Sequence, residues 1–209
     1  MSEAAPALQL FYFPGRGFAE PIRQILKLAD VSFEDVRKTF EEWKEIKSGS
    51  PYGVMPYVVF SDGKTLSGSI VIARHLAELY GLASKDPFEN SLLAAVADHL
   101  IDIRKIVFEL RKAEDFGYNK EAKQKQYDEK IPEKLVILES KIKDGFMEGI
   151  KCEKAANWAD IFTANIIQDL LNFDKEKVEK HANLIALCNK VNELPAIKKW
   201  LKERPVTEW

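Results

Sequence analysis

The pattern of hydrophobic and polar positions changes near residue 84, and the two halves of the chain predict different folds. In the first half, short apolar runs typical of strands occur at residues 8–13, 31–36, 57–60 and 64–66. Between and after them, helical spacing predicts helices over about 20–29, 41–47 and 70–80. The first two strands, joined through a helix, should be parallel, and the last two should form an antiparallel hairpin in the same sheet.

In the second half the same spacing predicts only helices. They are expected from residue 92 to about 116, over 121–143, from 157 onward, and over 176–193 and 195–203. Pro132 predicts a break or kink in the second of these helices. Asn157 is a good N-cap, and Asp160 stands at the position of a capping-box partner. The sequence thus predicts an α/β domain at 8–83, a linker at 84–89 and an all-α domain at 90–205.

Composition narrows the classes of function. The 209 residues carry a formal charge of -2 and are 46% hydrophobic, which is enough for a sizeable core but gives no basic surface overall for nucleic acid. Charged residues interrupt every apolar run before the roughly 18 residues that a membrane span needs. The two cysteines lie far apart, and no secretory signal pattern is found at the start. A cytoplasmic protein without nucleic-acid or membrane partners is expected.

Five motifs occur in an order that resembles a known family. They are YFPGRGFAE from Tyr12, WKEIK from Trp43, PYGVMP from Pro51, SIVIARHL from Ser69 and NWADI from Asn157. Together they resemble the sigma class of cytosolic glutathione S-transferases over residues 8–205. The resemblance implies a thioredoxin-like βαβ-ββα domain followed by an all-helical domain, with glutathione as co-substrate and a homodimer as the assembly.

The chemistry of such a site depends on a thiolate. Glutathione attacks electrophiles as the anion, and a free thiol has a pKa of about 8.5. Lowering that pKa to about 6.5 requires about 2.7 kcal/mol of preference for the anion. A hydrogen bond to a charged acceptor supplies about 1.5–3 kcal/mol, and a helix N-terminus up to about 2 kcal/mol more. The resemblance implies that Tyr12, at the end of the first strand, is this catalytic donor; its residue type and position alone would also suit an aromatic of the core.

The resemblance also implies how glutathione is held. The residues carried over are Tyr12, Trp43, Lys47, Gly53, Val54, Met55, Pro56, Gly68, Ser69 and Asp102. The bond before Pro56 should be cis, with the backbone of Met55 contacting the cysteinyl unit. Ser69, expected as a helix N-cap, should hold the γ-glutamyl carboxylate, and Trp43 and Lys47 should meet the glycyl end. Asp102 should reach the glutathione of the partner subunit.

Two positions depart from the family pattern. Gly68 stands where the family has Gln, which removes an amide that contacts the γ-glutamyl group. Phe18 stands where the family has a second Arg, which removes a cation near the tyrosine. An acid pair that binds divalent metals in one branch of the class is incomplete, because Asp98 is present but Ile101 replaces its partner, so no metal is expected.

These features favour a glutathione transferase that detoxifies hydrophobic electrophiles. The electrophile should bind between the domains, against side chains from about 100–118 and the C-terminal tail. Two alternatives remain: a non-catalytic carrier of hydrophobic ligands or crystallin-like structural protein, and a glutathione-dependent prostaglandin isomerase. A disulfide-exchange enzyme is unlike this sequence, since the first strand is followed by Pro14-Gly15-Arg16-Gly17 rather than C-x-x-C.

Overall fold

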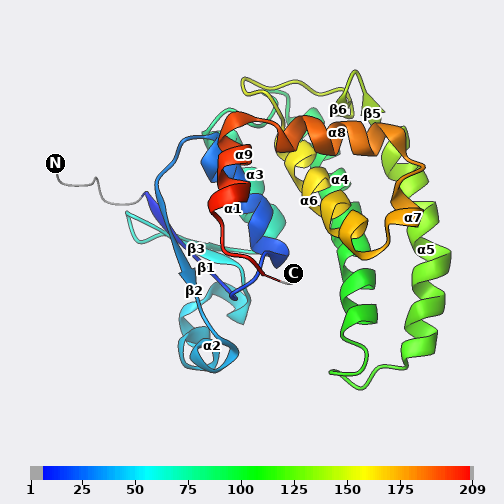
Figure 1. Ribbon diagram of the computed structural model, residues 1–209. Helices are drawn as coiled ribbons and strands as arrows, with labels where there is room; N and C mark the ends of the chain where they lie inside the picture. Colours follow the sequence, from blue (N-terminus) through cyan, green and yellow to red (C-terminus); the bar gives the residue numbers. More distant parts are fainter. Residues whose placement is uncertain (1–6, 208–209) are drawn as a thin grey trace. The chain divides into compact units, whose positions relative to one another are not determined.

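The computed structural model describes residues 7–207, which form two compact units (Figure 1). The chain up to Ala83 forms the first unit together with the segment that begins at Glu193. The second unit is Ser84–Asn192. The packing units therefore differ from the expected domains at both ends of the helical region: the segment from Glu193 packs with the first unit, and the expected linker 84–89 already contains the start of a helix.

The first unit contains a four-stranded mixed sheet of the expected kind. Its strands are β1 (Leu8–Tyr12), β2 (Phe33–Arg37), β3 (Tyr57–Phe60) and β4 (Thr65–Ser67), in the spatial order β2-β1-β3-β4. β1 and β2 are parallel, with Tyr12 opposite Arg37, while β3 is antiparallel to both β1 and β4. Side chains of β1 alternate between buried and half-buried, so Leu8, Leu10 and Tyr12 share the buried face.

Helical segments connect β1 to β2 and β2 to β3, and others follow β4. They are α1 (Glu20–Leu28), α2 (Phe40–Ile46), α3 (Ser69–Leu79) and α9 (Pro195–Glu203), with the 3₁₀ turns η1 (Gly17–Ala19), η2 (Lys47–Gly49) and η3 (Pro51–Gly53). α1 packs against both α3 and α9, and the apolar positions Ile22, Ile25 and Leu26 are fully buried. α2 begins at a complete capping box formed by Thr39 and Glu42. The thioredoxin-like arrangement predicted for the first domain is confirmed.

The second unit is largely helical. Its helices are α4 (Pro87–Arg111), α5 (Lys120–Ser140), α6 (Trp158–Phe173), α7 (Lys175–Val178) and α8 (Ala182–Asn192). α6 lies in the middle of the unit, in contact with α4, α7 and α8. It begins at the predicted capping box, in which Asn157 accepts from the Asp160 N–H and Asp160 accepts from the Asn157 N–H.

Three details differ from the sequence-based expectation for this unit. α5 continues through Pro132 without a break. Proline has no N–H to donate, but only one helix hydrogen bond is lost, and the turns on either side of Pro132 remain helical. A short hairpin of β5 (Ile142–Lys143) and β6 (Phe146–Met147) interrupts the helices. Its turn is Asp144-Gly145, with φ of 51° and 75°, the left-handed pair that a two-residue hairpin requires.

The third difference concerns the helix expected over 176–193. It is divided into α7 and α8, because the carboxylate of Glu139 satisfies polar groups where the chain turns. Glu139 contacts Nδ1 of the buried His181 at 2.7 Å and accepts from the N–H of Asn183 at 3.0 Å. A side chain from α5 thus does at the start of α8 what a local N-cap would otherwise do.

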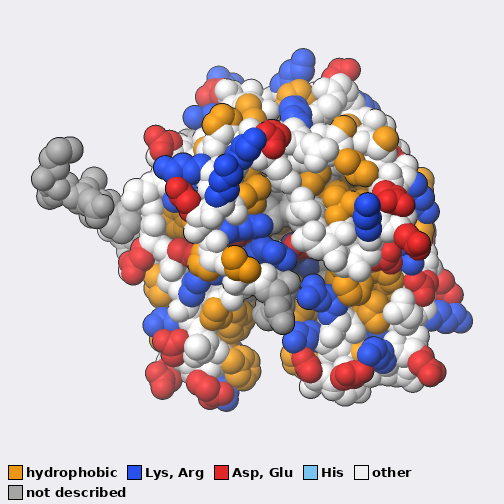
Figure 2. Space-filling model, in the orientation of Figure 1, with side chains coloured by type: hydrophobic (Ala, Val, Ile, Leu, Met, Phe, Trp, Pro, Cys, Tyr) orange, Lys and Arg blue, Asp and Glu red, His pale blue; other side chains and the backbone are white. Residues whose placement is uncertain are grey.

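Charged side chains of both signs are interspersed over the face seen in Figure 2, with hydrophobic side chains gathered in small groups. This agrees with the formal charge of -2, since no single sign of charge dominates that face. None of the helices formed within residues 7–207 is long and apolar enough to cross a bilayer.

Candidate functional site

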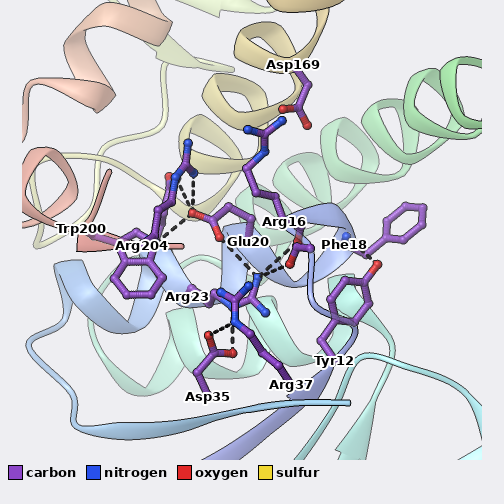
Figure 3. Close-up of polar contacts among 12 residues, drawn as sticks. Tyr12, Arg16, Phe18, Glu20, Arg23, Asp35, Arg37, Asp169, Trp200 and Arg204 are labelled. Atoms are coloured by element: carbon purple, nitrogen blue, oxygen red, sulfur yellow. Dashed lines mark hydrogen bonds and ion pairs between the residues drawn. The ribbon is translucent and has the colours of Figure 1, made fainter. Parts of the chain in front are cut away.

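Tyr12 lies at the end of β1, where the chain enters a tight loop before α1 (Figure 3). Its side chain is 5% exposed, and its hydroxyl accepts a hydrogen bond from the Phe18 N–H at 3.0 Å. Gly17 stands beside it with a φ of 38°, and a Cβ at that position would overlap the Tyr12 hydroxyl. The glycine therefore makes the close approach of the tyrosine possible.

This geometry prepares the hydroxyl as a donor. The bond from the Phe18 N–H uses a lone pair of the oxygen and not its proton, so it is compatible with donation of the O–H to an acceptor such as a sulfur anion. Phe18 belongs to η1, which leads directly into α1, so the hydroxyl lies close to the N-terminal end of a helix, where the helix dipole favours negative charge. Phe18 thus contributes through its backbone, which its side chain does not alter.

A cation that the sequence reading missed lies beside the tyrosine. The guanidinium carbon of Arg23 is 5.9 Å from the centroid of the Tyr12 ring, and Arg23 is completely buried. Arg23 donates to the carbonyl of Gly15 at 2.8 Å, in the loop that follows Tyr12. Its pairing with Glu20, three residues earlier on α1, is the i, i+3 signal that could have identified it.

The loop before β3 presents backbone groups. The Met55–Pro56 bond is cis, as the resemblance implied. Neither the N–H nor the C=O of Met55 is hydrogen-bonded to another described residue. The loop is held from behind by the buried Ser50, whose hydroxyl donates to the carbonyl of Val54 at 2.6 Å. Ser50 is a further residue that the sequence reading missed, and no motif drew attention to it.

Trp43 and Lys47 differ in what they can contact. Trp43 is 7% exposed and packs edge-on against Phe13 at 6.5 Å and in a tilted contact with Tyr57 at 6.4 Å, so it is largely a core residue. Lys47 is exposed and forms no ion pair with the residues that the structure describes. Its side chain runs close to Gly53, because a Cβ there would lie 3.3 Å from the Lys47 Cε. The expected cation and the expected loop glycine are therefore neighbours.

The start of α3 corrects one expectation. Ser69 is the first residue of the helix, and Gly68 occupies the N-cap position without a side-chain cap. Gly68 has φ 91° and ψ 126°, a conformation that L-residues rarely adopt. The Ser69 hydroxyl and the first N–H groups of α3 therefore stand at a helix N-terminus with no capping side chain in front of them, a setting suited to a carboxylate.

Asp102 lies on α4 in the helical unit. Its carboxylate pairs with Lys134 of α5 at 3.2 Å, and its side chain is 53% exposed. Within the stretch 100–118 of the same unit, an exposed aromatic cluster is formed by Phe108 in the last turns of α4 and by Phe116 and Tyr118 beyond its end. Phe108 lies 5.9 Å from Phe116, which stacks on Tyr118 at 6.1 Å between ring centroids.

Among residues 7–207, no group of three or more His, Cys, Asp or Glu side chains is placed to hold a metal ion. The two cysteines are free thiols, and burial raises the pKa of both, that of Cys188 to about 11. Neither therefore resembles an activated nucleophile.

The whole chain is similar to one family of enzymes. Residues 6–78 match the family description "Glutathione S-transferase, N-terminal domain", and residues 101–204 match "Glutathione S-transferase, C-terminal domain". The chain is 36% identical to "Glutathione S-transferase S1" of Drosophila melanogaster over 95% of its own length and 79% of that protein. It is 32% identical to "Hematopoietic prostaglandin D synthase" of Gallus gallus over 97% and 98% of the two chains.

A solved structure agrees with this. The monomeric Na-GST-3 of Necator americanus, a glutathione S-transferase, superposes with a TM-score of 0.84 at 30% identity, covering 97% of this chain and 99% of that one. The chain belongs to the glutathione S-transferase family, as an enzyme whose co-substrate is glutathione.

Proposed function

We propose that this enzyme is a sigma-class glutathione transferase in which the Tyr12 hydroxyl stabilises the glutathione thiolate. The observation that carries the proposal is the hydrogen bond from the Phe18 N–H to the Tyr12 oxygen, made possible by Gly17. That bond fixes the position of the hydroxyl oxygen and uses a lone pair of it, which is compatible with donation of the O–H proton to the sulfur. Tyr12 then acts as a hydrogen-bond donor, and the thiolate is the nucleophile that forms the new bond to the electrophile.

Glutathione has three polar regions, and the chain offers a suitable group for each. The N–H and C=O of Met55, which have no partner among the described residues, suit the backbone of the cysteinyl unit. The peptide would then lie extended beside the segment formed by Gly53, Val54, Met55 and cis-Pro56, as an added strand does at a sheet edge. The start of α3, with Gly68 and Ser69, suits the γ-glutamyl carboxylate. Lys47, an exposed cation beside Gly53 that forms no ion pair within residues 7–207, suits the glycyl carboxylate, with Trp43 packed behind it.

The aromatic cluster of Phe108, Phe116 and Tyr118 supports hydrophobic electrophiles as substrates. The three residues are at least 39% exposed, and Phe116 contacts both of the other rings, which suits a flat apolar molecule. Conjugation of such compounds is the chemistry of detoxification, and the absence of a metal remains our prediction. The relatives named prostaglandin D synthase make a glutathione-dependent prostaglandin isomerase the second candidate function.

Turnover assays separate these functions. Conjugation of glutathione to a chlorodinitrobenzene should fall by about 10- to 100-fold in kcat/KM for Tyr12→Phe, since one hydrogen bond to a charged sulfur is lost. Tyr80→Phe, which removes a hydroxyl at the end of α3, is the matched control and should retain full activity.

The outcomes discriminate among the three readings. A wild-type protein that isomerises a prostaglandin substrate faster than it conjugates any electrophile would favour the isomerase. Saturable binding of hydrophobic ligands with no turnover of either kind would favour the carrier or structural protein. Equal conjugation by wild type and Tyr12→Phe would contradict the role of Tyr12.

A homodimer is part of the proposal, and Asp102 is the residue through which one subunit would contribute to the other's site. Its exposed carboxylate is suited to the glutathione amino group. Sedimentation equilibrium should then report twice the chain mass of 23.9 kDa. Asp102→Asn should raise KM for glutathione a few-fold, because the side chain loses its negative charge but keeps one oxygen that can accept from the amino group. A monomer with unchanged KM in Asp102→Asn would contradict this part.

A further inference from the structure

Glu20 is a carboxylate without any exposure to solvent, in the first turn of α1. It accepts from the indole N–H of Trp200 at 2.9 Å and from Arg204 at 2.6 Å, both on the C-terminal segment that packs with the first unit (Figure 3). It also pairs with Arg23 at 3.4 Å on its own helix. Residues 180 and more positions away in the sequence therefore complete the surroundings of this buried charge.

Arg23 links Glu20 to the site. Besides its bond to the Gly15 carbonyl at 2.8 Å, it donates to the carbonyl of Arg16 at 3.4 Å and pairs with Asp35 at 3.0 Å. These carbonyls belong to the loop between Tyr12 and Phe18, so the guanidinium defines where that loop lies. The Phe18 N–H that holds the tyrosine hydroxyl is at the far end of the same loop.

The charges alternate along this chain of contacts. Arg204, Glu20, Arg23 and Asp35 follow one another as cation, anion, cation and anion, and Arg37 closes the row on Asp35 at 2.8 Å. A buried charge that loses one partner is left partly uncompensated, so its interactions with the remaining partners become stronger. If Arg204 or the Trp200 N–H is removed, the Glu20 carboxylate will therefore draw more strongly on Arg23, and Arg23 will release the loop carbonyls in part.

We infer that Trp200 and Arg204 are positioning residues for glutathione activation, acting through the buried Glu20–Arg23 pair on the loop that carries the Phe18 N–H to Tyr12. The inference rests on the proposed role of Tyr12 as donor to the thiolate. Neither residue is assigned any contact with glutathione. What they control is the direction of the Tyr12 O–H, and hence the pKa of the bound thiol rather than the affinity for the peptide.

The test compares two single substitutions in the C-terminal segment of the full-length enzyme. Trp200→Phe keeps an aromatic ring and removes the N–H, and Arg204→Leu removes the cation. The bound thiol is titrated by its ultraviolet absorbance, and the dissociation constant of glutathione and the thermal midpoint are measured beside it. Lys199→Met is the matched control, because Lys199 lies on the same helix and pairs only with Glu203 at the surface.

Both variants should raise the thiol pKa, so that the thiolate fraction at a pH below the midpoint falls by about 3- to 10-fold, as one weakened hydrogen bond implies. The dissociation constant for total glutathione measured at low pH, where the thiol is protonated, should change by less than about 2-fold. Arg204→Lys should restore most of the shift, because it returns a cation to Glu20. Lys199→Met should leave both quantities unchanged.

The inference is overturned if Trp200→Phe and Arg204→Leu lower the thermal midpoint but titrate like the wild type, since the contacts are then only a structural tie. If Arg204→Leu does not fold, Trp200→Phe, which keeps the aromatic ring and removes only the N–H, decides the question by the same titration. Failure of the proposed function looks different: the wild type itself then shows an unshifted thiol, or Tyr12→Phe leaves a shifted one unchanged.

Discussion

At the scale of single residues, the candidate site contains two glycines with backbone conformations that other residues rarely adopt. Gly17 has a φ of 38° and leaves space for the Tyr12 hydroxyl, while Gly68 has a φ of 91° at the start of α3. Positive φ strains any residue with a Cβ, and at Gly17 the Cβ would also occupy the place of the tyrosine oxygen. The two departures from the family pattern, Phe18 and Gly68, thus have opposite significance: the first acts through its backbone, and the second sets a conformation.

Gly17→Ala should lose activity as well as stability, whereas a comparable glycine away from the site should lose stability alone. It should cost about 1–3 kcal/mol of unfolding free energy for the strained φ and, in addition, displace the Tyr12 hydroxyl and reduce conjugation by at least about 10-fold. Gly63→Ala is the control, because Gly63 has a φ of 82° in a turn with open space around it. It should lose comparable stability in chemical denaturation and keep its activity. Full activity in Gly17→Ala would contradict the close approach described for Tyr12.

Gly68→Gln introduces the residue that the family carries at this position, and it should not improve glutathione binding. The space is open, with the nearest atom of Val71 at 3.8 Å from a Cβ, but a φ of 91° is unfavourable for glutamine. We expect a loss of about 1–3 kcal/mol in unfolding free energy and a glutathione dissociation constant, measured by calorimetry, that is no tighter than in the wild type. Tighter binding without loss of stability would show that the backbone adapts.

At the scale of elements, the start of α6 is built around a buried carboxylate. Asp160 has no exposed surface, and it accepts from the N–H groups of Asn157 and Met147 at 2.9 and 2.8 Å. Burial raises its pKa to about 6, although these hydrogen bonds and the charge of Lys190 oppose the shift. The capping box therefore fixes the helix start and ties β6 to it, while it carries a charge that the interior disfavours.

The pH dependence of stability should carry the sign of this shift. Because the folded pKa lies above the ordinary value of 3.8, the contribution of Asp160 is most favourable below that value and is lost as the pH rises through about 6. The unfolding free energy of the wild type minus that of Asp160→Asn should fall by about 2–3 kcal/mol between about pH 4 and pH 6.5.

Asp128→Asn is the control for that series. Hydrogen bonds from Lys177 and Gln124 lower the pKa of Asp128, so the corresponding difference should rise with pH instead of falling. Equilibrium urea unfolding at several pH values measures both. A difference for Asp160→Asn that is independent of pH would mean that burial does not raise the pKa of Asp160 above its value in the unfolded chain.

At the scale of the whole molecule, the last segment of the chain packs with the first part of the chain rather than with the helical unit that precedes it. The segment from Glu193 packs with the first unit, where the fully buried Ile197 of α9 joins the apolar surface that includes Ile25 and Leu26 of α1. A long-range contact of this kind closes the first unit only after the helical unit has been synthesised.

Hydrogen exchange measured by mass spectrometry should report this division. Ile197→Ala removes buried methyl groups at a cost of about 2–5 kcal/mol and should speed exchange in α1 and the strands rather than in α6. Leu184→Ala, at an equally buried position of α8, should do the reverse. Faster exchange in the helical unit alone for Ile197→Ala would place the segment with the other unit.

The sequence was most informative where a local pattern decides the structure. Alternation and turn residues gave β3 at Tyr57–Phe60, and the Asn157–Asp160 spacing gave the capping box of α6. It was least informative where a distant residue decides: Glu139 divides the last predicted helix of the helical unit, and Trp200 and Arg204 complete the environment of Glu20. The Asp144-Gly145 turn was a local signal that was missed, since helical spacing on both sides concealed a hairpin of four paired residues.

For the candidate site, motifs located Tyr12, Met55 and Lys47, but they did not locate what holds these residues in place. Arg23 and Ser50 act through carbonyl groups of neighbouring loops, and such contacts depend on the fold rather than on a sequence pattern. Ser69 was predicted as the N-cap of α3 but is the first residue of the helix, because Gly68, with its positive φ, occupies the N-cap position.

Titration of the thiolate absorbance of glutathione on the protein is the sharpest test of whether Tyr12 stabilises the bound thiolate. We expect a bound thiol with a pKa near 6.5, well below the free value of about 8.5, and a return to about 8.5 in Tyr12→Phe with glutathione still bound. A wild-type protein that binds glutathione with an unshifted thiol pKa would contradict this role of Tyr12.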